Sequence, residues 1–157
     1  MYDFFGDQLW HRLASWSRYY GRIDFPSFAR IGTLSSAPIV SIVDDDESVR
    51  LATTKLVRVH GFVAHGFASA EEFLQSPHAK ETSCLITDVR MPGMSGVDLQ
   101  SHLIRQGRRV PVIFITAFPE ADSEKRALAA GAVCFLTKPF DGQTLINYLS
   151  DALKAAK

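Results

Sequence analysis

Short apolar runs alternate with helical patterns from residue 38 to the end of the chain. The runs are the length of buried strands, and the stretches between them carry apolar residues at helical spacing. The pattern predicts strands at 39–43, 62–65, 84–87, 111–115 and 133–137. It predicts helices at about 47–59, 96–106, 121–130 and 141–156, with a fifth, short helix capped by Ser69 and Glu72. This (βα)5 alternation indicates an α/β, doubly wound sandwich, in which helices cover both faces of a parallel five-stranded sheet.

Polar side chains stand where four of the predicted strands end. Asp44 and Asp45 follow the first strand, Asp88 the third, Thr116 the fourth and Lys138 the fifth. In an open parallel sheet the carboxyl ends of the strands lie along one edge, where ligands bind. The sequence therefore predicts one small site holding three carboxylates, a hydroxyl and an ammonium group.

The chemistry of that group points to a metal and a phosphoryl group. Carboxylates about 4 Å apart repel by roughly 4 kcal/mol per pair at an effective dielectric of about 20, unless they share a cation. Mg²⁺ takes carboxylates together with water and phosphate oxygens. A hydroxyl and an ammonium group beside it complete a phosphoryl-binding site. Asp88 is then the predicted acceptor, as an aspartyl phosphate.

The acidic run after the first strand has a second interpretation. Such runs are often solvated or cap a helix, and the residues alone leave this open for Asp44 and Asp45. Asp46 and Glu47 fit the cap, because acidic groups favour the positive end of a helix.

Composition narrows the class of protein. Seventeen basic residues balance 17 acidic ones, so no overall field attracts nucleic acid. Cys84 and Cys134 fall within predicted strands, which favours buried, reduced thiols. No apolar run approaches the roughly 18 residues of a membrane span, and no secretory signal opens the chain. A cytoplasmic location is expected.

The first 36 residues differ from the rest, since they hold nine of the 17 aromatic side chains. Residues 7–20 carry the pattern of a short amphipathic helix. The segment could dock on the domain or a partner, anchor to a membrane surface, or be an extension with little fixed structure. We expect an aromatic extension at 1–36, in which the helix forms or which is disordered, and a separate domain at 37–157.

The motifs around the polar residues resemble one family. They are Val43-Asp44-Asp45, the segment Thr87-Asp88-Val89-Arg90-Met91-Pro92-Gly93-Met94-Ser95-Gly96, Ile115-Thr116-Ala117, and Leu136-Thr137-Lys138-Pro139-Phe140. In order and spacing, residues 38–156 resemble the receiver domain of two-component response regulators, as in chemotaxis regulators. The resemblance implies a flavodoxin-like fold with strand order 2-1-3-4-5.

The resemblance also implies a role for each site residue. Asp88 would accept a phosphoryl group from a histidine kinase or a histidine phosphotransfer protein. Mg²⁺, or Mn²⁺, would be held by Asp44, Asp45, Asp88 and the main-chain carbonyl of Arg90. Phosphoryl binding and switching would fall to Thr116, Ala117, Lys138 and Phe135.

Other features of the family concern the switch. Phe135 is the aromatic residue that would change rotamer, and it lacks a tyrosine hydroxyl. Arg90 and Phe118 occupy positions that tune phosphoryl lifetime, and their bulk predicts slow attack by water. Pro139 is a candidate cis-proline. The surface of helix 121–130, the last strand and the last helix would contact a partner or a second copy in a homodimer.

The sequence allows three rival interpretations. A haloacid-dehalogenase-type enzyme also uses an aspartate and Mg²⁺, but it needs an acid two residues further on, where Arg90 stands. A receiver that is never phosphorylated would serve only as an interaction module. A DNA-binding regulator needs a helix-turn-helix motif, and the sequence ends before one could begin. The chain would then be a stand-alone receiver or a fragment of a longer regulator. We therefore expect no direct nucleic-acid contact, no membrane contact, and no catalysis beyond the domain's own phosphorylation and dephosphorylation.

Overall fold

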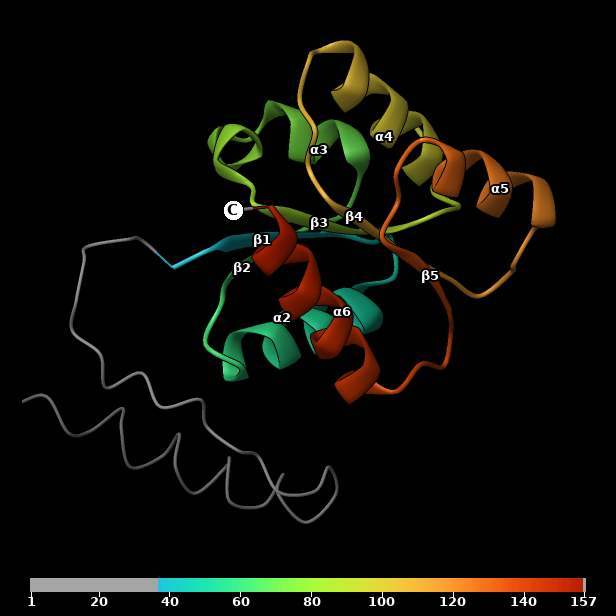
Figure 1. Cartoon of the computed structure of the whole chain (residues 1–157). Coiled ribbons are helices and arrows are strands. Elements are labelled where there is room, and N and C mark those ends of the chain that lie inside the picture. The colour runs from blue at the N-terminus through green and yellow to red at the C-terminus, as the bar shows by residue number, and fades with distance from the viewer. Residues whose placement is uncertain (1–36, 157) are drawn as a thin grey trace, which may run out of the picture. The chain divides into compact units, whose positions relative to one another are not determined.

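The computed structural model describes residues 37–156 as five parallel strands with helices on both faces (Figure 1). In chain order the elements are β1 (Ile39–Val43), α2 (Glu47–Val59), β2 (Val63–Phe67), α3 (Ala70–Gln75), the 3₁₀ helix η1 (Pro77–Glu81), β3 (Cys84–Asp88), α4 (Gly96–Arg105), β4 (Val112–Thr116), α5 (Ala121–Ala129), β5 (Cys134–Thr137) and α6 (Gly142–Ala155). The strand order is β2-β1-β3-β4-β5. The fold class and strand order expected from the sequence are confirmed.

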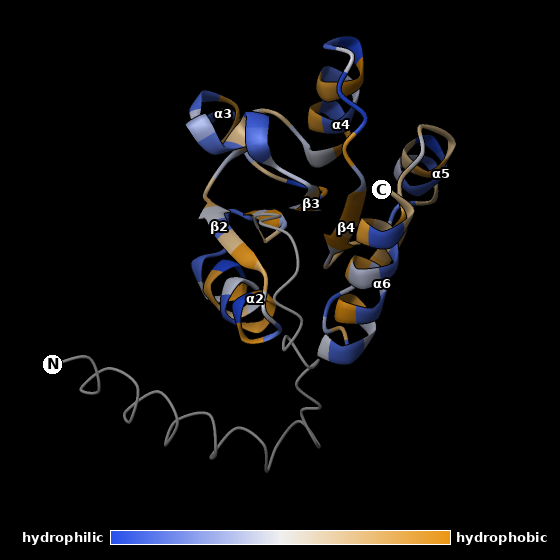
Figure 2. Cartoon of the chain, turned by 60° about the vertical axis from the view of Figure 1, so that its left-hand side comes forward, coloured by the Kyte–Doolittle hydropathy of each residue, from blue (hydrophilic) through white to orange (hydrophobic). Residues whose placement is uncertain are grey.

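Two apolar layers lie on either side of the sheet. One packs under α2 and α6 and includes Ile42, Ile86 and Leu145. The other packs under α3, α4 and α5 and includes Phe73 and Phe114. Figure 2 shows the matching colours, with hydrophobic strands inside and hydrophilic outer faces on the helices. The two apolar layers therefore hold the five strands in one sheet, and the carboxyl ends of the strands remain available to form a site.

Strands β3 and β4 are buried along their whole length, whereas the edge strands are not. Every residue of β3 and β4 is buried, but β2 and β5 each expose part of their length. Uninterrupted burial, expected for all five strands, holds only for β3 and β4. Strand β1 is buried except at Ile39, and the edge strands are more exposed because each has a neighbour on one side alone.

The two cysteines are free and buried, as predicted. Burial raises the pKa of Cys84 to about 12 and that of Cys134 to about 11. Both thiols are therefore protonated and unreactive at neutral pH.

Local polar residues set the helix starts. Asp46 caps α2, where its Oδ1 accepts from the N–H of Ser48 over 2.9 Å and from that of Val49 over 3.2 Å. Ser69 caps α3 by accepting from the N–H of Glu72, whose carboxylate in turn accepts from the N–H of Ala68. Both caps agree with the sequence analysis.

Four of the five strands differ from their predicted bounds by one or two residues, and β2 differs most. The apolar run ends at His65, but β2 continues to Phe67 because its register with β1 pairs Val43 with Phe67. Pairing with a neighbour sustains a strand past the end of its apolar pattern. The helix η1 was not predicted, and Pro77 opens it.

On the open edge of β2, one main-chain carbonyl accepts hydrogen bonds from a side chain. Arg58 of α2 donates from Nε over 3.1 Å and from Nη2 over 2.7 Å to the carbonyl of Ala64. On the β1 side, the N–H of Val63 donates to the carbonyl of Pro38, and the carbonyl of Phe67 accepts from the N–H of Asp44. Because successive residues of a strand point their main-chain groups to opposite sides, those of Ala64 face the open edge.

Within residues 37–156, none of the helices has the length and apolar character needed to cross a membrane. The amphipathic helix expected at 7–20 lies outside the described residues, as do the three interpretations of that segment.

Candidate functional site

A buried ion network joins three strand ends. Asp44 follows β1 and is fully buried, Asp88 is the last residue of β3, and Lys138 follows β5. Lys138 Nζ donates to Oδ2 of Asp44 and to Oδ2 of Asp88, each over 2.9 Å. Residues 94 and 50 positions apart in the chain therefore meet at one nitrogen.

A third carboxylate completes an acidic cluster. One carboxylate oxygen from each of Asp44, Asp45 and Asp88 lies within 4.8 Å of the others, and Asp45 is the exposed member. Three carboxylates and the Lys138 ammonium leave a formal charge of −2. This charge and the all-oxygen donor set suit a hard divalent cation such as Mg²⁺.

Main-chain N–H groups orient the two buried carboxylates. Oδ1 of Asp44 accepts from the N–H of Asp46 over 2.9 Å, and Oδ1 of Asp88 accepts from the N–H of Arg90 over 3.2 Å. Each carboxylate thus holds Lys138 with one oxygen and its own loop with the other.

The pKa values of the network reflect opposing effects. Burial raises the pKa of Asp44 above its ordinary value, although hydrogen bonds from Lys138 and Asp46 pull it back. For Lys138 burial alone would lower the pKa, but the bonds and charges of Asp44 and Asp88 outweigh it and raise the pKa. Lys138 therefore stays charged near neutral pH.

Thr116 ends β4 beside this network and is buried. Its Oγ1 accepts from the N–H of Phe118 over 3.1 Å. The N–H of Lys138 donates to the carbonyl of Thr116 over 2.8 Å, which fixes the two strand ends side by side. The structure thus brings together Asp44, Asp45, Asp88, Thr116 and Lys138, the five residues singled out from strand ends.

The remaining predicted residues lie around this centre. Phe135 is half-buried on β5, and its ring stacks on that of Phe114 at 4.9 Å between centroids. Ala117 is exposed next to Thr116. The peptide bond between Lys138 and Pro139 is cis.

Gly96 is a residue of the site that the sequence analysis did not single out. A Cβ on Gly96 would lie 2.0 Å from the carbonyl oxygen of Asp88, and its N–H donates to the carbonyl of Val89 over 2.9 Å. The glycine therefore lets the start of α4 close against the backbone of Asp88. Its place directly after the helix cap Ser95 was the signal available in the sequence.

Glu71 is a second residue that the sequence did not reveal. Its Oε1 accepts from the N–H of Met94 over 2.8 Å, which lowers the pKa of Glu71. An exposed carboxylate of α3 thereby holds the loop 89–95 from outside. Spacing along the chain could not show it, because the contact joins residues 23 positions apart.

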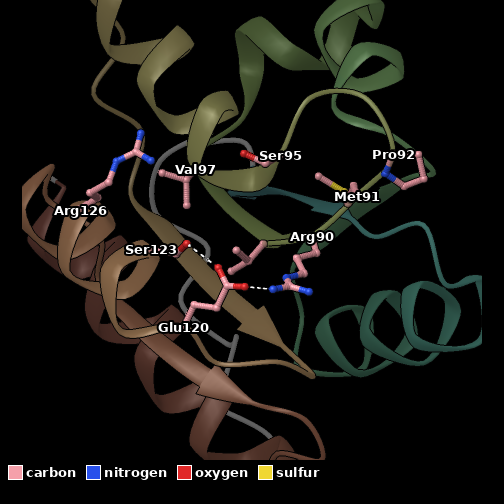
Figure 3. A pocket seen from close by; sticks show the side chains of 9 residues that line it. Arg90, Met91, Pro92, Ser95, Val97, Glu120, Ser123 and Arg126 are labelled. Carbon is pink, nitrogen blue, oxygen red and sulfur yellow. Dashed lines mark hydrogen bonds and ion pairs between the residues drawn. The ribbon is translucent and has the colours of Figure 1, made fainter.

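A pocket of about 390 Å³ opens between the β3–α4 loop (residues 89–95) and the first turns of α5, at the end of the β4–α5 loop (residues 117–120) (Figure 3). Its lining includes Arg90, Met91, Ser95, Glu120 and Arg126. Arg90 pairs with Glu120 across it. The pocket lies next to the acidic cluster along the chain, since Val89 and Arg90 directly follow Asp88, but none of the five strand-end residues lines it.

Comparison with known proteins agrees with this geometry. Nodulation protein W of Bradyrhizobium diazoefficiens is 43% identical over 127 residues, which are 81% of this chain and 56% of that protein. Response regulator protein TodT of Pseudomonas putida is 42% identical over 120 residues, 76% of this chain and 53% of that protein. The chain thus spans about half the length of the curated relatives it matches.

Solved structures show the same likeness. The crystal structure of FixJ-N superposes with a TM-score of 0.68 at 35% identity, covering 76% of this chain and 96% of that one. Response regulator StyR gives a TM-score of 0.71 at 40% identity, covering 77% of this chain and 61% of that one. The model of the response regulator receiver domain matches residues 40–150, and the chain therefore belongs to the receiver-domain family of two-component response regulators.

Proposed function

We propose that Asp88 is the phosphoacceptor of this receiver. The observation that carries the proposal is the position of its carboxylate at a central strand end, within hydrogen-bond distance of Lys138 and inside the acidic cluster. Response regulators receive phosphate from histidine kinases, so the donor is a phosphohistidine of a kinase or a phosphotransfer protein. The reaction is the domain's own phosphorylation and not turnover of a separate substrate.

The chain's residues divide the transfer among them. A carboxylate oxygen of Asp88 attacks the phosphorus, the new P–O bond forms as the P–N bond breaks, and the electron pair leaves with the imidazole nitrogen. Lys138, freed from its bond to the Asp88 carboxylate, donates to a phosphoryl oxygen. Thr116 turns its hydroxyl to another phosphoryl oxygen.

Asp44, Asp45, Asp88 and the main-chain carbonyl of Arg90 would hold Mg²⁺ or Mn²⁺. The formal charge of −2 and the oxygen donors support this assignment. When bound, the cation supplies positive charge that offsets the charge on the phosphoryl oxygens.

The face formed by α5, β5 and α6 is the proposed output surface. It carries the exposed apolar side chains Leu128 and Tyr148, and the half-buried Phe135 lies in its strand. Pulling Thr116 and Lys138 toward a phosphoryl group moves the ends of β4 and β5 and so alters this face. A partner protein or a second copy of the chain would respond to the change. We further propose that residues 37–157 form the receiver unit and residues 1–36 an extension.

Incubation of the full chain with acetyl phosphate and MgCl₂, followed by intact-mass measurement, tests the proposal. Wild type should gain the mass of one phosphoryl group, and Asp88→Asn should not. Asp98→Asn removes an exposed carboxylate from the first turn of α4 and should behave as wild type. Equal labelling of wild type and Asp88→Asn would refute Asp88 as the acceptor.

A further inference from the structure

Arg90 and Glu120 link the two loops that border the site. Nη2 of Arg90 pairs with Oε1 of Glu120, the cap residue of α5, and the Oγ of Ser123 donates to the other carboxylate oxygen over 3.3 Å (Figure 3). Glu120 therefore holds Arg90 on one side and the first turn of α5 on the other.

Arg90 contacts both the acceptor and the opposite loop. Its N–H donates to Oδ1 of Asp88, and its guanidinium carbon lies 5.8 Å from the centre of the Phe118 ring. The main chain of Arg90 thus follows Asp88, while its side chain contacts the β4–α5 loop at Phe118 and Glu120.

The same loop is held from inside by Thr116. In the described structure the hydroxyl of Thr116 accepts from the N–H of Phe118. Turning that hydroxyl to a phosphoryl oxygen breaks this bond and draws residues 117–120 toward Asp88. The ion pair with Arg90 fixes the far end of the same four residues and resists the movement.

We infer that Glu120 is a positioning residue: acting through Arg90, it holds the β4–α5 loop in the resting position and opposes the response to phosphorylation. The inference rests on the proposed function of Asp88. Removing a contact made only in the resting state raises the apparent affinity for whatever binds the other state. Because the two side chains are 59% and 45% exposed, the expected gain is that of a surface ion pair, about two- to fivefold.

The test is a titration of the full chain with beryllofluoride in the presence of MgCl₂, followed by amide NMR. Glu120→Gln should bind about two- to fivefold more tightly than wild type. Glu124→Gln is the matched control, since it removes the same charge from the first turn of α5, and Glu124 forms no ion pair among residues 37–156. It should bind as wild type does.

A double-mutant comparison separates the ion pair from a general effect of charge. In an Arg90→Gln background, which keeps the main-chain carbonyl, Glu120→Gln should change the affinity no further. An unchanged or weaker affinity for Glu120→Gln, an equal gain with Glu124→Gln, or a gain that persists without Arg90 would each overturn the inference. Failure of wild type to respond, or a full response by Asp88→Asn, would instead overturn the proposed function.

Discussion

The two loops beside Asp88 are held in opposite ways. The β3–α4 loop is closed by the tight main-chain contact between Gly96 and the carbonyl of Asp88, and the exposed carboxylate of Glu71 accepts from the N–H of Met94. The β4–α5 loop has exposed residues throughout and is held by one hydroxyl and one exposed ion pair.

The difference separates two tasks at one site. The loop that carries the proposed metal ligand Arg90 has little room to adjust, so the ligand atoms are placed before any ion binds. The loop that would move in the proposed mechanism, when Thr116 turns, is held by a single hydroxyl acceptor and an exposed ion pair. Four changes test this contrast, from the largest expected effect to the smallest.

Gly96→Ala should break the tightly closed loop. A Cβ 2.0 Å from a main-chain oxygen forces the backbone apart, and overpacking of this kind costs about 3 kcal/mol of unfolding free energy. Urea unfolding measures the loss. Gly142→Ala is the control, because Gly142 also opens a helix but meets only the flexible side chain of Leu56 at 3.1 Å. Similar losses in both variants would contradict the close contact at Asp88.

Thr116→Val should loosen the movable loop with a smaller cost. The variant keeps the shape of the side chain but cannot accept from the N–H of Phe118, which removes about 1 kcal/mol of stability. Hydrogen exchange at Phe118 should quicken, whereas exchange at Met94 should stay as in wild type. Thr116→Ser keeps the hydroxyl and should restore protection. Faster exchange in both loops would show that the loops are not held independently.

Glu71→Gln should change the pH dependence of stability through the tightly held loop. The hydrogen bond from Met94 lowers the pKa of Glu71 from its ordinary value of 4.5 in the folded chain. A depressed carboxyl pKa stabilises the fold above the unfolded pKa, and this stability is lost as the pH falls through the folded pKa. Thermal unfolding should therefore show a gap between wild type and Glu71→Gln near pH 6 that narrows as the pH is lowered. A gap that is constant with pH would contradict the assignment.

His65 lies on β2, outside both loops, and its protonation should affect stability without affecting either loop. Its ring stacks on His78 at 3.8 Å, and burial, followed by the charges of His78 and Arg58, lowers its pKa below 6.5 against the opposing effect of Glu81. The unfolded chain then binds more protons, so stability should fall slightly as the pH drops below about 6.5. His65→Gln should remove this part of the pH profile and leave hydrogen exchange in the two loops unchanged.

The strand-end residues were predictable because the topology of a parallel sheet brings carboxyl ends to one edge. The alternation of strands and helices was enough to predict that Asp88 and Lys138 lie together, as they do. Gly96, Glu71 and Glu120 act through contacts between loops, and loop geometry leaves no periodic pattern in a sequence. The last two residues of β2 were not predicted for a related reason, because they pair through the backbone with β1 and continue no apolar pattern.

The hydrogen bonds from the guanidinium of Arg58 to the carbonyl of Ala64 affect the tendency of the domain to aggregate at high concentration. A free edge strand is a template for another chain, and a charged group seated on one of its acceptors must be displaced before a foreign strand can pair there. The sheet can therefore end at β2 without inviting edge-to-edge aggregation. Pairing of a second copy at this point of the edge is thereby disfavoured.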